Sequence, residues 1–241
     1  GAIRVLSCAA LWIAGVTNVG AYALTIALSP VVGVVLVALT GNLKTEDGPE
    51  ASWAEVTPNL GWLLLGSLFA AALVNAGPIT VDILGHDAPP ELVTRFGNAV
   101  IFARIPLFLF QAVQAALLPR LARLAAQRKL SEFKRGLQQL LVLVGSVGVL
   151  GTVGAFALGP WVLKLVYDGG IDRRTMTLLA FASALYMLAL AIAQAVIALN
   201  GHARVAIGWC AGFVAFALVA WLSSNDLYLR VELALVASSL V

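Results

Sequence analysis

An uninterrupted apolar stretch near the start of the chain sets the first constraint. Residues 5–43 contain no Asp, Glu, Lys, Arg or His. Coiled into one α-helix, these 39 residues would extend about 58 Å, whereas the hydrocarbon core of a bilayer is about 30 Å thick. The polar pair Thr17-Asn18, followed by Gly20, provides a turn inside the stretch. The sequence therefore predicts two helices here, at 2–17 and 20–40.

The rest of the chain is similarly poor in charge. Of its 241 residues, 61% are hydrophobic and 11% are charged, against roughly 45–50% and about 25% in soluble domains. So few charges cannot cover the surface of a water-soluble fold. We expect an all-α, polytopic membrane protein with seven crossings and a partial eighth, belonging to a longer protein. The further helices are predicted at 59–84, 96–118, 137–159, 175–199 and 205–222, with a last one from 227.

The basic residues predict which helix ends face the cytoplasm. Segment 120–135 carries six cations and one acid, Glu132, so the positive-inside rule places it in the cytoplasm. Counting helices outward puts Arg4, Lys44 and the turn at 201–204 on the same side. A topology signal accounts for most of this charge, and an amphipathic helix resting on anionic lipid headgroups is the alternative interpretation. The six cations are Arg120, Arg123, Arg128, Lys129, Lys134 and Arg135.

An acidic connector divides the chain. Residues 41–58 hold four acids against one lysine and two prolines that break helices. We interpret this segment as a linker between two helical bundles. Residues 1–5 and 201–205 share Gly, Arg and Val at equivalent positions, and an offset of about six helices is typical of a parallel internal repeat in a transporter.

Charged residues inside the apolar helices are the main functional signal, because an unpaired charge at mid-bilayer costs several kcal/mol or more. Asp82 and Arg95 lie at similar shallow depths on successive helices, which predicts a structural ion pair. Arg104 lies about 18 Å along its helix, near the membrane middle, with no carboxylate at its level in that hairpin. It either binds a phosphate or other anion in a central cavity, or pairs with an acid outside this chain.

Polar residues near Arg104 complete the candidate substrate-binding set. Gln111 follows Arg104 by seven residues, which places both on nearly the same helical face, and Gln114 lies a turn further on. Asn75 lies about 13 Å deep on the preceding helix. We expect Arg104, Gln111, Gln114 and Asn75 to line a cavity.

Three prolines interrupt predicted crossings: Pro30, Pro78 and Pro106. Each removes a helix hydrogen bond and permits a bend, so each is a candidate hinge, although static membrane helices also contain proline. His86 and His202 each stand alone, without acids or cysteines at metal-ligand spacing. With no catalytic or phosphate-loop motif present, we expect neither an enzyme nor a metal, cofactor or nucleic-acid binder.

One segment carries a family resemblance. Residues 102–137 contain an early proline, then Leu118-Pro119-Arg120-Leu121, then the basic segment, and 198–204 read Ala-Leu-Asn-Gly-His-Ala-Arg. This layout resembles the polysaccharide-export branch of the multidrug/oligosaccharidyl-lipid/polysaccharide flippase superfamily.

The resemblance implies a two-lobed fold of twelve or more helices, of which about eight are present here. Residues 1–40 would be the last two helices of the first bundle, 41–58 the cytoplasmic linker, and 59–241 a second six-helix bundle with a truncated last helix. It implies flipping of a polyprenyl-diphosphate-linked sugar across the bacterial cytoplasmic membrane by alternating access. Arg104 would meet the diphosphate, and membrane lipids and a polysaccharide polymerase or glycosyltransferase would be partners. A cation-coupled multidrug exporter of the same fold and a non-transporting membrane scaffold are the alternatives.

Overall fold

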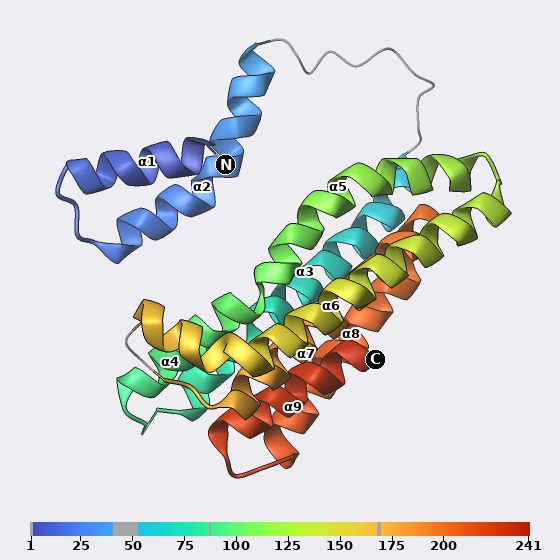
Figure 1. Ribbon diagram of the computed structural model, residues 1–241. Coiled ribbons are helices and arrows are strands. Elements are labelled where there is room, and N and C mark those ends of the chain that lie inside the picture. The colour runs from blue at the N-terminus through green and yellow to red at the C-terminus, as the bar shows by residue number, and fades with distance from the viewer. Residues whose placement is uncertain (1, 41–52, 87, 168–169) are drawn as a thin grey trace. The chain divides into compact units, whose positions relative to one another are not determined.

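The computed structural model describes residues 2–40, 53–86, 88–167 and 170–241. Most of these residues are helical, with no strand among them, which confirms the all-α prediction (Figure 1). The chain divides into two compact units, Gly1–Ala51 and Ser52–Val241. The helices are α1 (Ala2–Ile13), α2 (Val19–Leu39), α3 (Trp53–Leu84), α4 (Pro90–Ala103), α5 (Ile105–Ala126), α6 (Leu130–Tyr167), α7 (Arg173–Ala198), α8 (His202–Leu222) and α9 (Leu227–Leu240).

The first unit contains α1 and α2. The first helix ends at Ile13 rather than at residue 17 because Gly15 adopts a left-handed conformation with φ of 72°. The N–H of Val16 then donates to the carbonyl of Leu11 at 3.0 Å, which closes the helix end. The next helix starts at the predicted turn, where the Asn18 side chain accepts from the N–H of Gly20 at 2.8 Å.

Five helices are long and apolar enough to cross a membrane: α2, α3 from Thr57, α6, α7 and α8. The pair α4 and α5 forms a sixth crossing if counted as one span bent by 40°. The five or six crossings are fewer than the seven predicted, because α1 is too short, whereas a short last helix agrees with the predicted partial eighth. With 12 residues in α1 and 14 in α9, these helices extend only about 18 and 21 Å, less than the roughly 30 Å hydrocarbon core. The described chain is thus a multi-pass membrane protein by length and composition.

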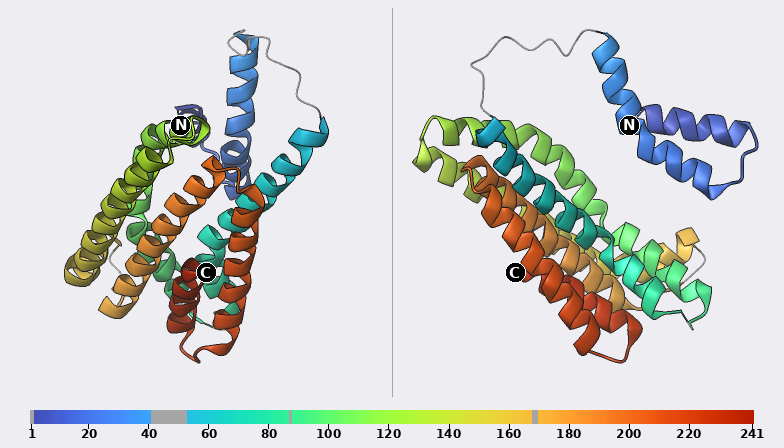
Figure 2. Two further views of the ribbon diagram at one scale, coloured as in Figure 1. Left: turned by 90° about the vertical axis from the view of Figure 1, so that its right-hand side faces the viewer. Right: turned by 180° about the vertical axis from the view of Figure 1, so that it is seen from behind.

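The second unit is organised around α7, which contacts α4, α5, α6, α8 and α9 (Figures 1 and 2). Small residues allow the helices to approach closely, as is common where lipid removes the hydrophobic drive for association. A Cβ built on Gly148 of α6 would lie 2.7 Å from the Cβ of Ala184 on α7, and one built on Gly212 of α8 would lie 2.7 Å from the carbonyl oxygen of Ser238 on α9. These glycines therefore set the spacing of neighbouring helices.

The predicted connectors prove more helical than expected. The linker assigned to 41–58 ends earlier, because residues 53–58 already belong to α3, while 41–52 lie outside the described residues. The basic segment 120–135 is a helical hairpin in which only 127–129 separate α5 from α6. Arg128 makes that turn with φ of 56°, and the N–H of Lys129 donates to Leu124 at 3.0 Å.

Candidate functional site

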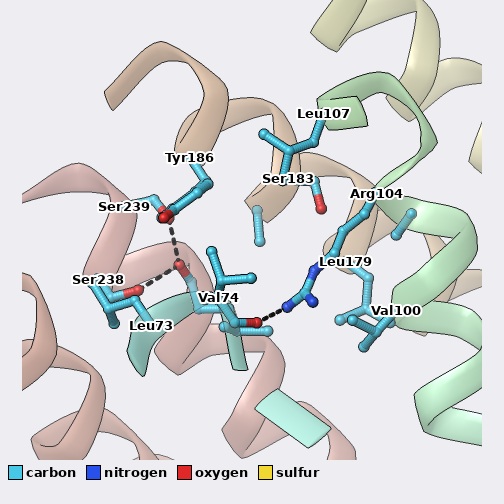
Figure 3. A pocket seen from close by; sticks show the side chains of 13 residues that line it. Leu73, Val74, Val100, Arg104, Leu107, Leu179, Ser183, Tyr186, Ser238 and Ser239 are labelled. Atoms are coloured by element: carbon cyan, nitrogen blue, oxygen red, sulfur yellow. Dashed lines mark hydrogen bonds between the residues drawn. The ribbon is translucent and has the colours of Figure 1, made fainter. Parts of the chain in front are cut away.

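A proline on α3 supplies the partner of Arg104. Proline has no N–H, so the carbonyl four residues earlier loses its helical hydrogen bond. For Pro78 that carbonyl belongs to Val74. The Arg104 guanidinium, through Nη2, donates to this oxygen, as Figure 3 shows. The proline thus frees an acceptor inside the membrane-spanning part of the unit, and the arginine occupies it.

Arg104 itself lies at the break between α4 and α5. Arg104 is the C-cap residue of α4 and the N-cap residue of α5, with φ of −95° and ψ of −1°. Its backbone N–H donates to the carbonyls of both Val100 and Ile101, at 3.2 Å each. Pro106 stands at the second position of α5, where a missing N–H costs least. Its ring and missing donor prevent α4 from continuing straight into α5. The sequence interpretation of Pro106 as a bend is therefore consistent with the 40° angle between the two helices.

A small cavity surrounds the guanidinium. Its volume is about 30 Å³, room for a water molecule but not for a diphosphate. Four hydroxyl groups from α7 and α9 line it together with Arg104: those of Ser183, Tyr186, Ser238 and Ser239. Tyr186 donates to the Ala70 carbonyl at 3.0 Å. Ser238 and Ser239 both donate to the Leu235 carbonyl at 2.9 Å (Figure 3).

No carboxylate lines this cavity in the described part of the chain, and Arg104 forms no ion pair there. A neutral carbonyl holds the guanidinium instead. Hydrogen bonds with one charged partner are weaker than those between two opposite charges. The Val74 carbonyl therefore holds Arg104 less strongly than a buried carboxylate would.

The other predicted substrate-binding residues do not join Arg104. Asn75 is exposed on α3 and donates to its own helix, at Ala71, over 2.8 Å. Gln111 is exposed, Gln114 is half-buried, and neither lines the cavity. The prediction assumed one straight helix, in which residues seven apart share a face. The break at Arg104 interrupts that periodicity.

The predicted ion pair between Asp82 and Arg95 is not formed. Both side chains are exposed, and the ion pairs of the described residues involve neither of them. Their neighbours Val81 and Phe96 are both fully buried. Successive helical residues point about 100° apart, so burying Val81 and Phe96 turns the two charges away from the core. The similar depths of Asp82 and Arg95 allowed a pair, but the rotation of each helix about its axis turns the two side chains to the surface.

The candidate hinges Pro30 and Pro78 lie inside continuous helices, α2 and α3 respectively. Their role as hinges stays a prediction. Among the described residues no group of three or more His, Cys, Asp and Glu could hold a metal ion.

Sequence reasoning missed a buried carboxylate on α9. Glu232 is fully buried, and in the described structure its two carboxylate oxygens accept no hydrogen bond. Its ionic partner is Arg174 at the start of α7, whose Nε lies 3.8 Å away. Arg174 also pairs with Asp172 at 3.7 Å and Asp226 at 3.3 Å. An acid inside the apolar run that starts at 227 was the available signal.

Two helix caps position this ionic cluster. Asp172 caps α7, accepting from the N–H of Thr175 at 3.2 Å, and Asp226 caps α9, accepting from that of Leu229 at 3.0 Å. The Leu229 N–H, helped by Arg174, lowers the pKa of Asp226 below its ordinary value. The cluster therefore ties the start of α7 to the start of α9, away from the Arg104 cavity.

This cluster yields an asymmetric stability prediction. Changing Arg174→Ala leaves the Glu232 charge buried without its cation, and we expect a loss of about 2 kcal/mol, below the roughly 3–5 kcal/mol of fully buried pairs because Arg174 is half-exposed. Changing Glu232→Gln removes the buried charge instead and should cost less than about 1 kcal/mol. Unfolding of the detergent-solubilised variants measures both. A larger loss for Glu232→Gln contradicts this account, and the Arg174→Ala loss should shrink at acidic pH as the carboxylate is protonated.

Comparisons with protein-family models, with curated proteins and with solved structures gave no match. Chemically, the site offers a guanidinium fork, a neutral partner and a bent helix. Such an arrangement suits reversible binding of an anion within a membrane.

Proposed function

We propose that this protein is part of a transporter that flips a polyprenyl-diphosphate-linked oligosaccharide across the cytoplasmic membrane by alternating access. The observation that carries the proposal is Arg104, a cation inside the second unit that is held by a backbone carbonyl and by no described carboxylate. A membrane protein retains such a charge at considerable cost. A diphosphate crossing the bilayer needs a cation of this kind along its path.

The bend at Arg104 supports a conformational cycle. The cavity of about 30 Å³ is closed to a diphosphate, so substrate entry requires the surrounding helices to separate. The 40° break between α4 and α5 is a place where their angle can change without breaking further helical bonds. Movement of this pair relative to α3 would separate Arg104 from Val74 and free the guanidinium for phosphate oxygens. In the proposed fold, two bundles with twelve or more helices in total enclose the path of the lipid-linked sugar.

A cation-coupled drug exporter is the second candidate, because Glu232 is a buried acid of the type such an exporter uses. Two observations favour the flippase over it. Glu232 is already paired with Arg174, and it does not line the cavity around Arg104. The cavity therefore presents a cation and hydroxyl groups to a substrate, with no acid among its described lining.

Reconstitution of the native full-length protein in liposomes tests the proposal. We expect transbilayer movement of a fluorescent polyprenyl-diphosphate sugar, and about tenfold slower movement of the same lipid with a single phosphate, which offers the guanidinium fewer oxygens and less charge. Movement is measured by quenching of the outer-leaflet fluorophore. Extrusion of a cationic dye driven by a proton or sodium gradient, without lipid movement, would show the drug exporter instead. Inactivity in both assays, with the protein folded, would favour the scaffold.

A further inference from the structure

A second hollow lies on the α5–α6 hairpin, apart from the Arg104 site. Its volume is about 420 Å³, within the roughly 300–1,000 Å³ of small-ligand pockets. Two cations, Arg120 and Arg135, and the amide of Gln139 line it together with leucines from both helices. We refer to this hollow as the hairpin groove.

The length of α6 places the groove relative to the bilayer. The helix has 38 residues and extends about 57 Å, well beyond the roughly 30 Å hydrocarbon core. From Leu140 to Leu163 it carries no charge, a run of about 36 Å that suffices to span the core. Arg135 therefore lies just outside the core, at headgroup level, while Leu143 lies inside it. The groove thus crosses the boundary between headgroups and acyl chains.

The groove is open because Gly136 contributes no side chain to its lining. Leu121 and Leu140 are buried beneath the groove and pack with Phe133 in the core between α5, α6 and α7. Gly136 faces Leu121, since a Cβ built there would lie 3.1 Å from the Leu121 side chain. Any larger residue at 136 would intrude into the groove. Leu143, at the groove's apolar end, is exposed in this unit and offers a surface for an acyl chain.

The charges of the lining match a monoanion. Arg120 and Arg135 contribute two positive charges and Glu132 one negative charge, which leaves one net positive charge in the groove. Glu132 is itself paired with Lys129 over 3.9 Å, so it competes little for the two guanidinium groups. A phosphodiester headgroup carries one negative charge, and guanidinium forks suit its oxygens. Basic pockets between membrane helices at the cytoplasmic face are typical sites for anionic lipid headgroups.

We propose that the hairpin groove binds one molecule of an anionic diacyl phospholipid of the phosphatidylglycerol type. Its phosphodiester lies between Arg120 and Arg135, and its acyl chains run from there along Leu143 toward the hydrocarbon core. This site is distinct from general attraction of lipids by the basic hairpin, because it assigns binding to two of six cations and to a shaped hollow. It does not depend on what the protein transports.

Native mass spectrometry of the full-length protein, released from detergent with defined lipid, tests the proposal. The probes are phosphatidylglycerol and phosphatidylcholine with identical acyl chains. We expect one phosphatidylglycerol to bind preferentially, and Arg120→Gln with Arg135→Gln to weaken its binding by about tenfold or more. The matched control removes two cations of the same hairpin, Arg123→Gln with Lys134→Gln, which do not line the groove. This control should weaken binding by less than about threefold.

A steric variant provides the second arm. Gly136→Leu keeps every charge but fills the groove, and we expect loss of bound phosphatidylglycerol as in the double arginine variant. A melting temperature equal to that of the wild type shows that each variant is folded. Equal weakening by both charge pairs, or equal binding of the zwitterionic lipid, would overturn the proposal in favour of diffuse attraction. Displacement of phosphatidylglycerol by equimolar polyprenyl diphosphate would overturn it in favour of a substrate site.

Discussion

Replacing Arg104 with alanine is expected to reduce flipping of the lipid-linked sugar by roughly 10- to 100-fold, because hydrogen bonds to charged groups contribute about 1.5–3 kcal/mol each. The variant removes the cation that lines the cavity and leaves four hydroxyl groups there. Because the variant also leaves the Val74 carbonyl without its described donor, we expect a stability loss of about 1–3 kcal/mol, which thermal unfolding measures separately. The rate is measured in liposomes at matched protein density.

Two further variants separate charge from geometry at this position. Arg104→Lys keeps the positive charge but loses the planar fork, so partial activity is expected, above that of alanine and below that of arginine. Arg95→Ala is the control, because it removes an exposed arginine from the same bent helix pair and should leave the rate within about twofold. Wild-type flipping by Arg104→Ala would refute the proposed role and leave Arg104 as a structural contact with α3.

Replacing Gly148 with valine should strongly destabilise the packing of α6 against α7. Even a Cβ at this position would lie 2.7 Å from the Cβ of the buried Ala184, closer than real Cβ contacts. Overpacking of this kind costs about 1–3 kcal/mol or more, which corresponds to a fall in melting temperature of roughly 2–10 °C for a chain of this size. Thermal unfolding in detergent, followed by circular dichroism, measures the shift.

The control for this prediction lies one turn away on α6. Gly145→Val adds the same side chain where no atom lies within 4 Å of the new Cβ. The difference in helix propensity between glycine and valine is therefore the same for the two variants. We expect Gly145→Val to melt close to the wild type. Equal shifts for both variants would mean that propensity, and not the contact with Ala184, accounts for the loss.

Part of the Arg104 site could be predicted from the sequence. The depth of Arg104 follows from counting residues along a helix, and the free acceptor of Val74 follows from the position of Pro78 four residues later. What could not be predicted was that these two groups meet, since they lie 30 residues apart. The prediction that Arg104 and Gln111 share one helix face was wrong for a related reason, because the helix is broken at Arg104.

The basic segment 120–135 was likewise predicted in part. It was predicted as a basic cytoplasmic loop, yet its residues continue α5 and α6 almost to the turn at 127–129. Its charges were visible in the sequence. The groove between Arg120 and Arg135 was not, because it depends on Gly136 facing Leu121 across the hairpin.

By itself, the sequence determined that this chain is helical and suited to a membrane, and roughly where its apolar helices lie. Those properties depend on local hydrophobicity and on turn residues such as Asn18, which act within a few residues. Only the tertiary structure decided which charges meet. Depth in the bilayer follows from sequence position, but rotation about each helix axis follows from how neighbouring helices pack. That rotation turned Asp82 from Arg95 and brought Glu232 to Arg174.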